Sequence, residues 1–156
     1  MSILVCGGAG YIGAHVVRLL RQRGDRVVVV DDLSTSNAAR VGDTPLVRLD
    51  VATDEARSTL SNLMMDEDVT AVIHFSARKQ VGESVKRPTW YYQQNIGGMA
   101  NVLAAMEDAG VDQMIFSSSA AVYGMPNAEI VTEDMAGRPI NPYGETKLIG
   151  EWMMAD

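Results

Sequence analysis

Tyr143 and Lys147 stand four residues apart near the carboxyl end of the chain, and this spacing places both side chains on one face of a helix. A phenol is a poor base at neutral pH, but a neighbouring ammonium group and a cationic nicotinamide ring would favour the phenolate. Tyr143 could then take a proton from an alcohol while a nicotinamide takes the hydride, with Ser119 holding the alcohol oxygen. The alternative for such a pair is ordinary packing between turns on a helix surface.

A glycine-rich segment near the amino terminus could bind the phosphates of such a nucleotide. Residues 5–13 follow the apolar run 3–5 and open the amphipathic run 15–23, so they are typical of a strand, a tight turn and a helix. Glycine is needed there for a sharp turn, for close approach of backbone N–H groups to phosphate, and for helix–strand packing. The helix N-terminus would face the anion.

A carboxylate follows the second apolar run. Residues 27–30 end in Asp31, eighteen residues after Gly13, which is where a ribose-binding acid belongs in dinucleotide-binding folds. The polar segment 33–37 would wrap the adenosine end, although a plain surface loop has the same composition. Strand, glycine turn, helix, strand and acid in register together predict dinucleotide binding.

Strands and helices alternate along the rest of the chain. We predict strands at 46–51, 71–75 and 114–116, helices at 55–65 and 88–109, and a last helix from Tyr143. This alternation predicts an α/β fold of the Rossmann type, a parallel sheet with helices on both faces, forming one domain over residues 1–156.

Polar residues follow several of these strands on the side where ligands bind in such folds. Asp50 could face an adenine or cap a helix beginning near Thr53, and we leave both open. Lys79 could contact phosphate or ribose, or be a solvated loop residue. The serines at 117–119 can donate to a substrate or cofactor hydroxyl.

The predicted helix 88–109 has Pro88 in its first turn and Gly110 after its end. Its interior pair at 97–98 would cost stability unless something packs closely against it. Asn95, just before that pair, is unusual in a helix interior, so we expect it to hydrogen-bond to a neighbouring loop.

Composition excludes several classes of function. Thirteen basic against twenty acidic residues give a net charge of −7 without a basic cluster, so we expect no nucleic-acid partner. No apolar run is long enough for a membrane span and no leader pattern opens the chain, which favours a cytoplasmic location. The single cysteine, Cys6, is expected to be a buried structural thiol. We assign no metal site.

Five segments together resemble the UDP-glucose 4-epimerases, which are members of the extended short-chain dehydrogenase/reductase family. They are Gly7–Gly13, Asp31–Leu33, Lys79–Ser84, Phe116–Gly124 and Asn141–Lys147. The resemblance implies tightly held NAD, oxidation of the sugar 4-hydroxyl, rotation of the 4-keto sugar, and return of the hydride to its other face. UDP-glucose and UDP-galactose would interconvert.

The same resemblance assigns residues. Ser119, Tyr143 and Lys147 would be catalytic. The cofactor contacts it implies, together with the glycine positions argued above, are Gly7, Gly10, Tyr11, Ile12, Gly13, Asp31, Asp32, Leu33, Ser34, Thr35, Ser36, Asp50, Val51, Phe75, Ser76, Lys79, Asn95, Tyr143 and Lys147. Family members that dehydrate nucleotide sugars carry Thr-Asp-Glu where this chain has Ser119-Ala120-Ala121, which disfavours dehydration.

Members of that family are about twice as long. The resemblance therefore implies that the chain is truncated after the Tyr-x-x-x-Lys helix and lacks a carboxyl-terminal substrate domain, so activity would need the missing half. The strand 114–116 would then be an apolar sheet edge, and we expect poor solubility or association. The alternatives are an inert NAD-binding module and an interaction protein that dimerises through the helices 88–109 and 143–155.

Overall fold

The computed structural model describes residues 1–127 and 129–155, which cluster into two compact units. We call residues 1–77 and 98–117 the sheet unit, and the described residues of 78–97 and 118–155 the helical unit. The sheet unit holds β1 (Ser2–Cys6), α1 (Tyr11–Gln22), β2 (Arg26–Asp31), η1 (Ala38–Val41), β3 (Leu46–Arg48), α2 (Ala56–Asp66), β4 (Ala71–His74), α5 (Gly98–Ala109) and β5 (Met114–Phe116). The helical unit holds α3 (Val81–Lys86), α4 (Pro88–Tyr92), η2 (Gln93–Gly97), η3 (Ala120–Tyr123) and α6 (Pro142–Ala155). That the two units form one domain over residues 1–156 stays a prediction.

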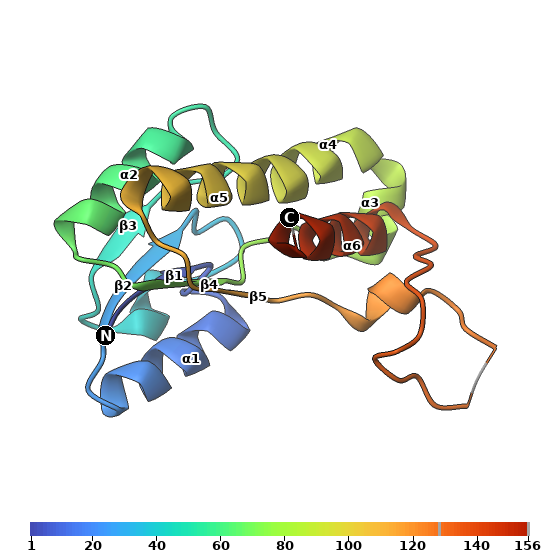
Figure 1. Ribbon diagram of the computed structural model, residues 1–156, viewed down its shortest axis with the longest axis horizontal. Helices are drawn as coiled ribbons and strands as arrows, with labels where there is room; N and C mark the ends of the chain where they lie inside the picture. Colours follow the sequence, from blue (N-terminus) through green and yellow to red (C-terminus); the bar gives the residue numbers. More distant parts are fainter. Residues whose placement is uncertain (128, 156) are drawn as a thin grey trace. The chain divides into compact units, whose positions relative to one another are not determined.

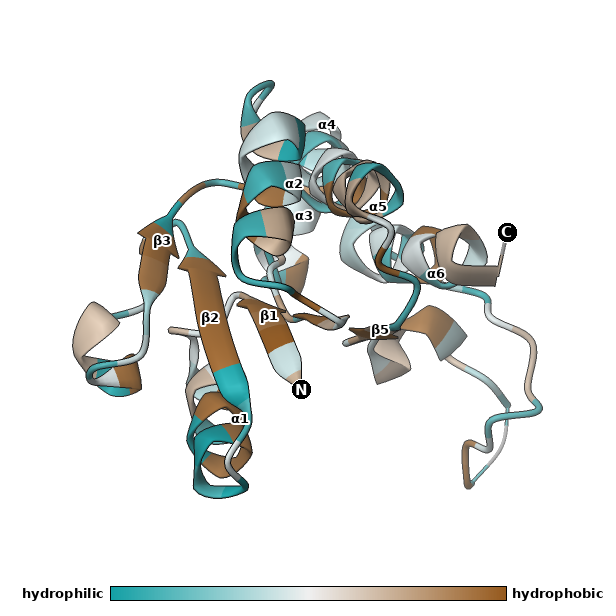
Figure 2. Cartoon of the chain, turned by 60° about the vertical axis from the view of Figure 1, so that its left-hand side comes forward, coloured by the Kyte–Doolittle hydropathy of each residue, from teal (hydrophilic) through white to brown (hydrophobic). Residues whose placement is uncertain are grey.

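The five strands form one parallel sheet in the order β3-β2-β1-β4-β5, which confirms the predicted fold class. β1 and β2 are buried along nearly their whole length and strongly apolar (Figure 2), as strands covered on both faces must be. In the sheet unit α2 and α5 lie on one face and α1 on the other (Figure 1). The apolar side of α1, with Val17 and Leu20, packs against the strands.

The predicted strand 46–51 is too long, because β3 ends at Arg48. α2 begins at Ala56, which agrees with the predicted helix 55–65 but not with the alternative start near Thr53 that Asp50 would cap. Oδ1 of Asp50 accepts a hydrogen bond from the Ala52 amide at 2.9 Å, and the carbonyl of Asp50 accepts one from the amide of Thr53. This turn ends the strand and delays the helix, so Asp50 does not cap α2.

The predicted helix 88–109 is not uniform. α4 ends at Tyr92, the π-helical turn η2 follows, and α5 begins at Gly98. A Cβ on Gly98 would lie 2.9 Å from Cγ2 of Val51, so the close neighbour predicted for the glycine pair is present at this residue. Around Gly97 the space within 4 Å of a Cβ is empty. A π turn widens the helix and often marks a functional position.

β5 is the last strand in the order and pairs with β4. Its central side chain, Ile115, is 64% exposed. The prediction of an apolar edge strand therefore holds for the described residues. The bounds of β1, α1, β2, β4, β5 and α6 agree with the predicted ranges to within a few residues, whereas α3, η1 and η3 were not predicted. No helix in the described part of the chain is long and apolar enough to span a membrane.

Candidate functional site

The glycine turn between β1 and α1 is held by contacts that only glycine permits. Gly7 has a φ of +78°, and a Cβ there would lie 2.7 Å from the amide nitrogen of Ser76. A Cβ on Gly13 would lie 2.3 Å from the carbonyl oxygen of Gly7. The turn therefore rests directly on the segment after β4, and the first turn of α1 rests on the glycine turn.

The N-terminus of α1 offers hydrogen-bond donors. Gly10 is its N-cap residue and provides no side chain to accept from the first amides, and the first turn holds no acidic residue. Tyr11 and Ile12 are both exposed there. Uncapped amides and the positive end of the helix dipole suit an anion such as a pyrophosphate.

Asp31 is built into the same region from the end of β2. Its Oδ2 accepts from the amide of Ala9 at 3.0 Å, while Oδ1 accepts from the amide of Leu33 at 2.9 Å and from the hydroxyl of Ser36 at 2.6 Å. The side chain thus ties the glycine turn to the loop after β2. A carboxylate can accept about four hydrogen bonds, which is one more than these three.

The rest of that loop is ordered by its own side chains. Oδ1 of Asp32 accepts from the amide and the hydroxyl of Ser34, and Thr35 is exposed. Leu33 has a φ of +59°, which costs energy for a residue with a branched side chain. The loop that is predicted to contact the ribose therefore has a defined conformation, which these hydrogen bonds stabilise.

Other sequence-predicted contacts of the sheet unit lie at neighbouring strand ends. Phe75 and Ser76 follow β4, and the amide of Phe75 donates to the carbonyl of Cys6 at 2.8 Å. Val51 is a core residue.

The single cysteine, Cys6, is a buried thiol, as predicted. Burial, and secondarily the charge of Asp31, raise the pKa of the Cys6 thiol to about 12, which agrees with a structural thiol.

In the helical unit, α6 carries both Tyr143 and Lys147, as the spacing predicts. Tyr143 is half-buried, whereas Lys147 is 4% exposed. Burial lowers the pKa of Lys147 to about 8. Groups with perturbed pKa values cluster at functional sites, so Lys147, one helical turn after Tyr143, is a candidate site residue.

Ser119 is held next to this helix by a close backbone contact. Ser119 is the N-cap of η3, and its Oγ accepts from the amide of Ala121 at 3.2 Å. A Cβ on Gly144 would lie 2.6 Å from the carbonyl oxygen of Ala121, so α6 rests on η3 at this point. The neighbouring Ser118 hydroxyl donates to Glu151 on α6. The structure thus brings the Ser119 turn and the Tyr143 helix together.

Asn95 links three parts of the helical unit, which confirms the predicted hydrogen bond to a loop. Its Oδ1 accepts from the amide of Arg78 at 2.8 Å, and its Nδ2 donates to the carbonyl of Arg78 and to Oγ1 of Thr146, both at 3.0 Å. Thr146 lies between Tyr143 and Lys147 and donates to the Tyr143 carbonyl. Lys79, one residue after Arg78, is exposed, and its contact with a cofactor stays a prediction.

Sequence reasoning missed the residues that seat α6. Gly144 permits the contact with Ala121, Thr146 receives Asn95, and Oδ1 of Asn141 accepts from the Gly144 amide at 2.9 Å as an N-cap. The sequence does contain a signal for the start of α6, because Asn141-Pro142 is a typical N-cap residue followed by proline at the first helical position.

Comparisons with known proteins agree with this geometry. The model of the NAD dependent epimerase/dehydratase family matches residues 3–156. A UDP-glucose 4-epimerase of Lactobacillus helveticus is 46% identical over 155 residues, which are 99% of this chain and 46% of that protein.

Two solved structures are similar throughout. The UDP-glucose 4-epimerase of Brucella ovis in complex with NAD is 43% identical, with a TM-score of 0.94 over 99% of this chain and 47% of that one. The enzyme of Stenotrophomonas maltophila with bound NAD and formylated UDP-arabinopyranose is 43% identical, with a TM-score of 0.93 over 100% of this chain and 48% of that one. The chain spans about half the length of the relatives it matches.

Proposed function

We propose, from the premise that the chain belongs to the NAD dependent epimerase/dehydratase family, that it binds NAD and acts in the interconversion of UDP-glucose and UDP-galactose. The observation that carries this proposal is the seating of α6, which buries Lys147 one turn after Tyr143 and rests on the Ser119 turn. The relatives that are solved with NAD, and in one case with a UDP-sugar, support the choice of ligands.

The residues of the glycine turn fit a dinucleotide. A side chain at Gly7 would fill the space against Ser76, and the uncapped start of α1 presents amides to a pyrophosphate. Asp31 would accept from a ribose hydroxyl with its remaining lone pair. The proposed contacts are Gly7, Gly10, Tyr11, Ile12, Gly13, Asp31, Asp32, Leu33, Ser34, Thr35, Ser36, Asp50, Val51, Phe75, Ser76, Lys79, Asn95, Tyr143 and Lys147.

Three side chains of the helical unit would take part in the proton transfer: Tyr143, Ser119 and Lys147. NAD supplies the hydride acceptor when bound. The Tyr143 phenolate takes the proton of the sugar 4-hydroxyl, and the Ser119 hydroxyl holds that oxygen before and after it becomes a carbonyl. Lys147 favours the phenolate through its charge, and Tyr143 returns the proton when the hydride comes back.

Turnover with defined products tests this proposal. The chain is co-expressed with the carboxyl-terminal half of the Lactobacillus helveticus relative, and UDP-galactose is followed for conversion to UDP-glucose. We expect conversion that falls at least about a hundredfold in Tyr143→Phe. A 4-keto-6-deoxy product would instead support a dehydratase.

The alternative is an NAD-binding module without turnover, and it is supported by the sheet unit, where the glycine turn and Asp31 are held together by the hydrogen bond from the Ala9 amide. NAD binding by the chain, with no conversion when the carboxyl-terminal half of the relative is supplied, would establish this alternative and overturn the epimerase proposal. Uniform binding of a cofactor without a substrate site gives no rate.

We also infer a homodimer through the helices 88–109 and 143–155, in a cytoplasmic protein. Trp152 on α6 is 58% exposed, which is typical of a side chain that a partner covers. Sedimentation of the chain and of Trp152→Glu tests the dimer. We expect a dimer that this substitution dissociates, and a monomer for the unaltered chain would contradict it.

A further inference from the structure

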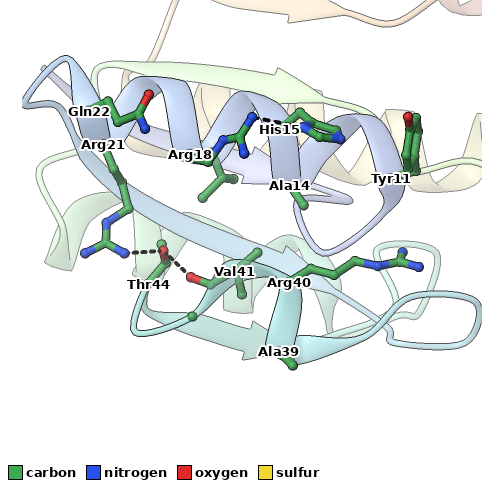
Figure 3. A pocket seen from close by; sticks show the side chains of 12 residues that line it. Tyr11, Ala14, His15, Arg18, Arg21, Gln22, Ala39, Arg40, Val41 and Thr44 are labelled. Atoms are coloured by element: carbon green, nitrogen blue, oxygen red, sulfur yellow. Dashed lines mark hydrogen bonds between the residues drawn. The ribbon is translucent and has the colours of Figure 1, made fainter.

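A groove lies between the outer side of α1 and the segment 38–44 that contains η1 (Figure 3). We call it the α1–η1 groove. Its volume is about 720 Å³, within the range of about 300–1,000 Å³ that small-molecule sites occupy. Of the residues assigned to NAD, it includes Tyr11 but neither Asp31 nor the loop after it. The α1–η1 groove therefore adjoins the proposed cofactor site at Tyr11, shares none of the other residues assigned to NAD, and belongs entirely to the sheet unit.

The groove is positively charged in an acidic chain. Arg18 and Arg21 line it from α1, where Arg18 lies beside His15 and Arg21 reaches across to Thr44, and Arg40 lines it from the opposite side (Figure 3). None of the described residues that line it carries a carboxylate. Arg21 is paired with Asp43 outside the lining. Arg18 and Arg40 are the other two positively charged residues that line the groove.

Arg18 and Arg40 form no ion pair with a residue in the described ranges. Nη2 of Arg18 lies 3.3 Å from Nδ1 of His15, and Nη1 of Arg40 donates weakly to the carbonyl of Ala9 at 3.4 Å. Two arginines thus line one groove without forming an ion pair with any of the described residues. Such an arrangement favours a bound anion.

The groove has a fixed floor. Val17 and Val41 are buried beneath it, and Thr44 is 5% exposed. Oγ1 of Thr44 accepts from Nη1 of Arg21 at 3.1 Å and donates to the carbonyl of Val41 at 2.6 Å. These contacts hold the two sides of the groove together at one end.

We propose that the α1–η1 groove is a second binding site, for a small molecule that bears an oligophosphate group. Phosphate oxygens bind Arg18 and Arg40, because planar guanidinium groups pair with phosphate through two parallel hydrogen bonds. The small apolar side chains of Ala14 and Ala39, which also line the groove, leave room for the remainder of the ligand. Arg40 contacts Ala9, whose amide donates to Asp31, so the groove borders the proposed cofactor site without sharing its acid.

Calorimetric titration with tripolyphosphate tests this site. The unaltered chain is compared with the double variant Arg18→Gln/Arg40→Gln and with Arg57→Gln, in the absence and in the presence of saturating NAD. Arg57 is an exposed arginine of α2 paired with Asp108, outside the groove, so it controls for loss of surface charge. Circular dichroism checks that each variant is folded.

We expect tripolyphosphate to bind in both conditions, at least about tenfold more weakly to the double variant and within about twofold of the unaltered chain for Arg57→Gln. Repeating the titration with adenosine triphosphate distinguishes a free oligophosphate from a nucleotide, which would bind more tightly through its base. Equal affinity in the double variant, absence of binding at millimolar concentration, or loss of binding when NAD is added would overturn the proposal. The last result would place the probe at the glycine turn.

Discussion

Gly144 on α6 approaches Ala121 on η3 so closely that a Cβ on the glycine would lie 2.6 Å from the alanine carbonyl oxygen. This contact holds the helix that carries Tyr143 and Lys147 against the turn capped by Ser119. Because the obstructing atom belongs to the backbone, it cannot move aside as a flexible side chain would.

The substitution Gly144→Ala should therefore destabilise the protein. We expect the free energy of unfolding in urea to fall by about 1–3 kcal/mol, the usual cost of overpacking. Gly97→Ala is the matched control, because a Cβ at Gly97 meets nothing within 4 Å and the change should be much smaller. Equal losses in the two variants would show that the close contact does not determine stability.

Asn95 and Thr146 should be energetically coupled. Removing Asn95 leaves the backbone groups of Arg78 and the Thr146 hydroxyl without their partner, so Asn95→Ala should cost about 1–3 kcal/mol. In a double-mutant cycle with Thr146→Val we expect a coupling energy of at least about 0.5 kcal/mol. If the losses in free energy of unfolding of the two single variants simply add, the hydrogen bond between Asn95 and Thr146 does not hold α6 in place.

Lys147 should make stability increase with pH in the alkaline range. Its pKa is lowered by burial to about 8 in the folded chain, against 10.5 for an ordinary lysine. Below about pH 8 both states hold the proton, and the cost of burying the charge is fully present. Between about pH 8 and 10.5 the unfolded state binds more protons, so the free energy of unfolding rises as pH rises.

Urea unfolding of the unaltered chain and of Lys147→Met from pH 7.5 to 10 isolates this effect. We expect the unaltered chain to gain roughly 1–3 kcal/mol relative to the variant across this range. Since other titrating groups are common to both chains, they cancel in the difference. A constant difference would contradict the desolvated state of Lys147.

Ile115 should promote self-association through the sheet edge. It is 64% exposed on β5, the last strand in the sheet order. We expect Ile115→Lys to reduce association in sedimentation velocity runs while changing the free energy of unfolding by less than about 0.5 kcal/mol, because a charge on an edge strand opposes pairing. Unchanged association would exclude this edge as its cause.

The first half of the sheet unit could be predicted from sequence because its signals are local. The apolar runs of β1 and β2, the glycines between them and Asp31 each report on a few neighbouring residues. That these strands lie parallel then follows from the general rules of such folds. Cys6 was also predicted correctly as a buried thiol, since it lies within a strand of this kind.

What sequence could not show depends on distant partners. The π turn η2 was read as plain helix, because only the fold brings Asn95 to Arg78 and Thr146. The seating of α6 needs Gly144 to meet Ala121, twenty-three residues earlier. The α1–η1 groove escaped notice because Arg40 lies far along the chain from Arg18, and only the packing of η1 beside α1 places both on one groove.

The central claim is that NAD binds at the start of α1, and calorimetric titration with NAD tests it most directly. Ile12→Asp adds a negative charge at the proposed pyrophosphate site on a residue that is 57% exposed, so the fold should be retained. Leu19→Asp makes the same change on the same helix at a residue that is 59% exposed and lies in a later turn. We predict micromolar or tighter binding, at least about tenfold weaker in Ile12→Asp and within about twofold in Leu19→Asp. No binding to the folded chain, or equal affinity in Ile12→Asp, would contradict the account.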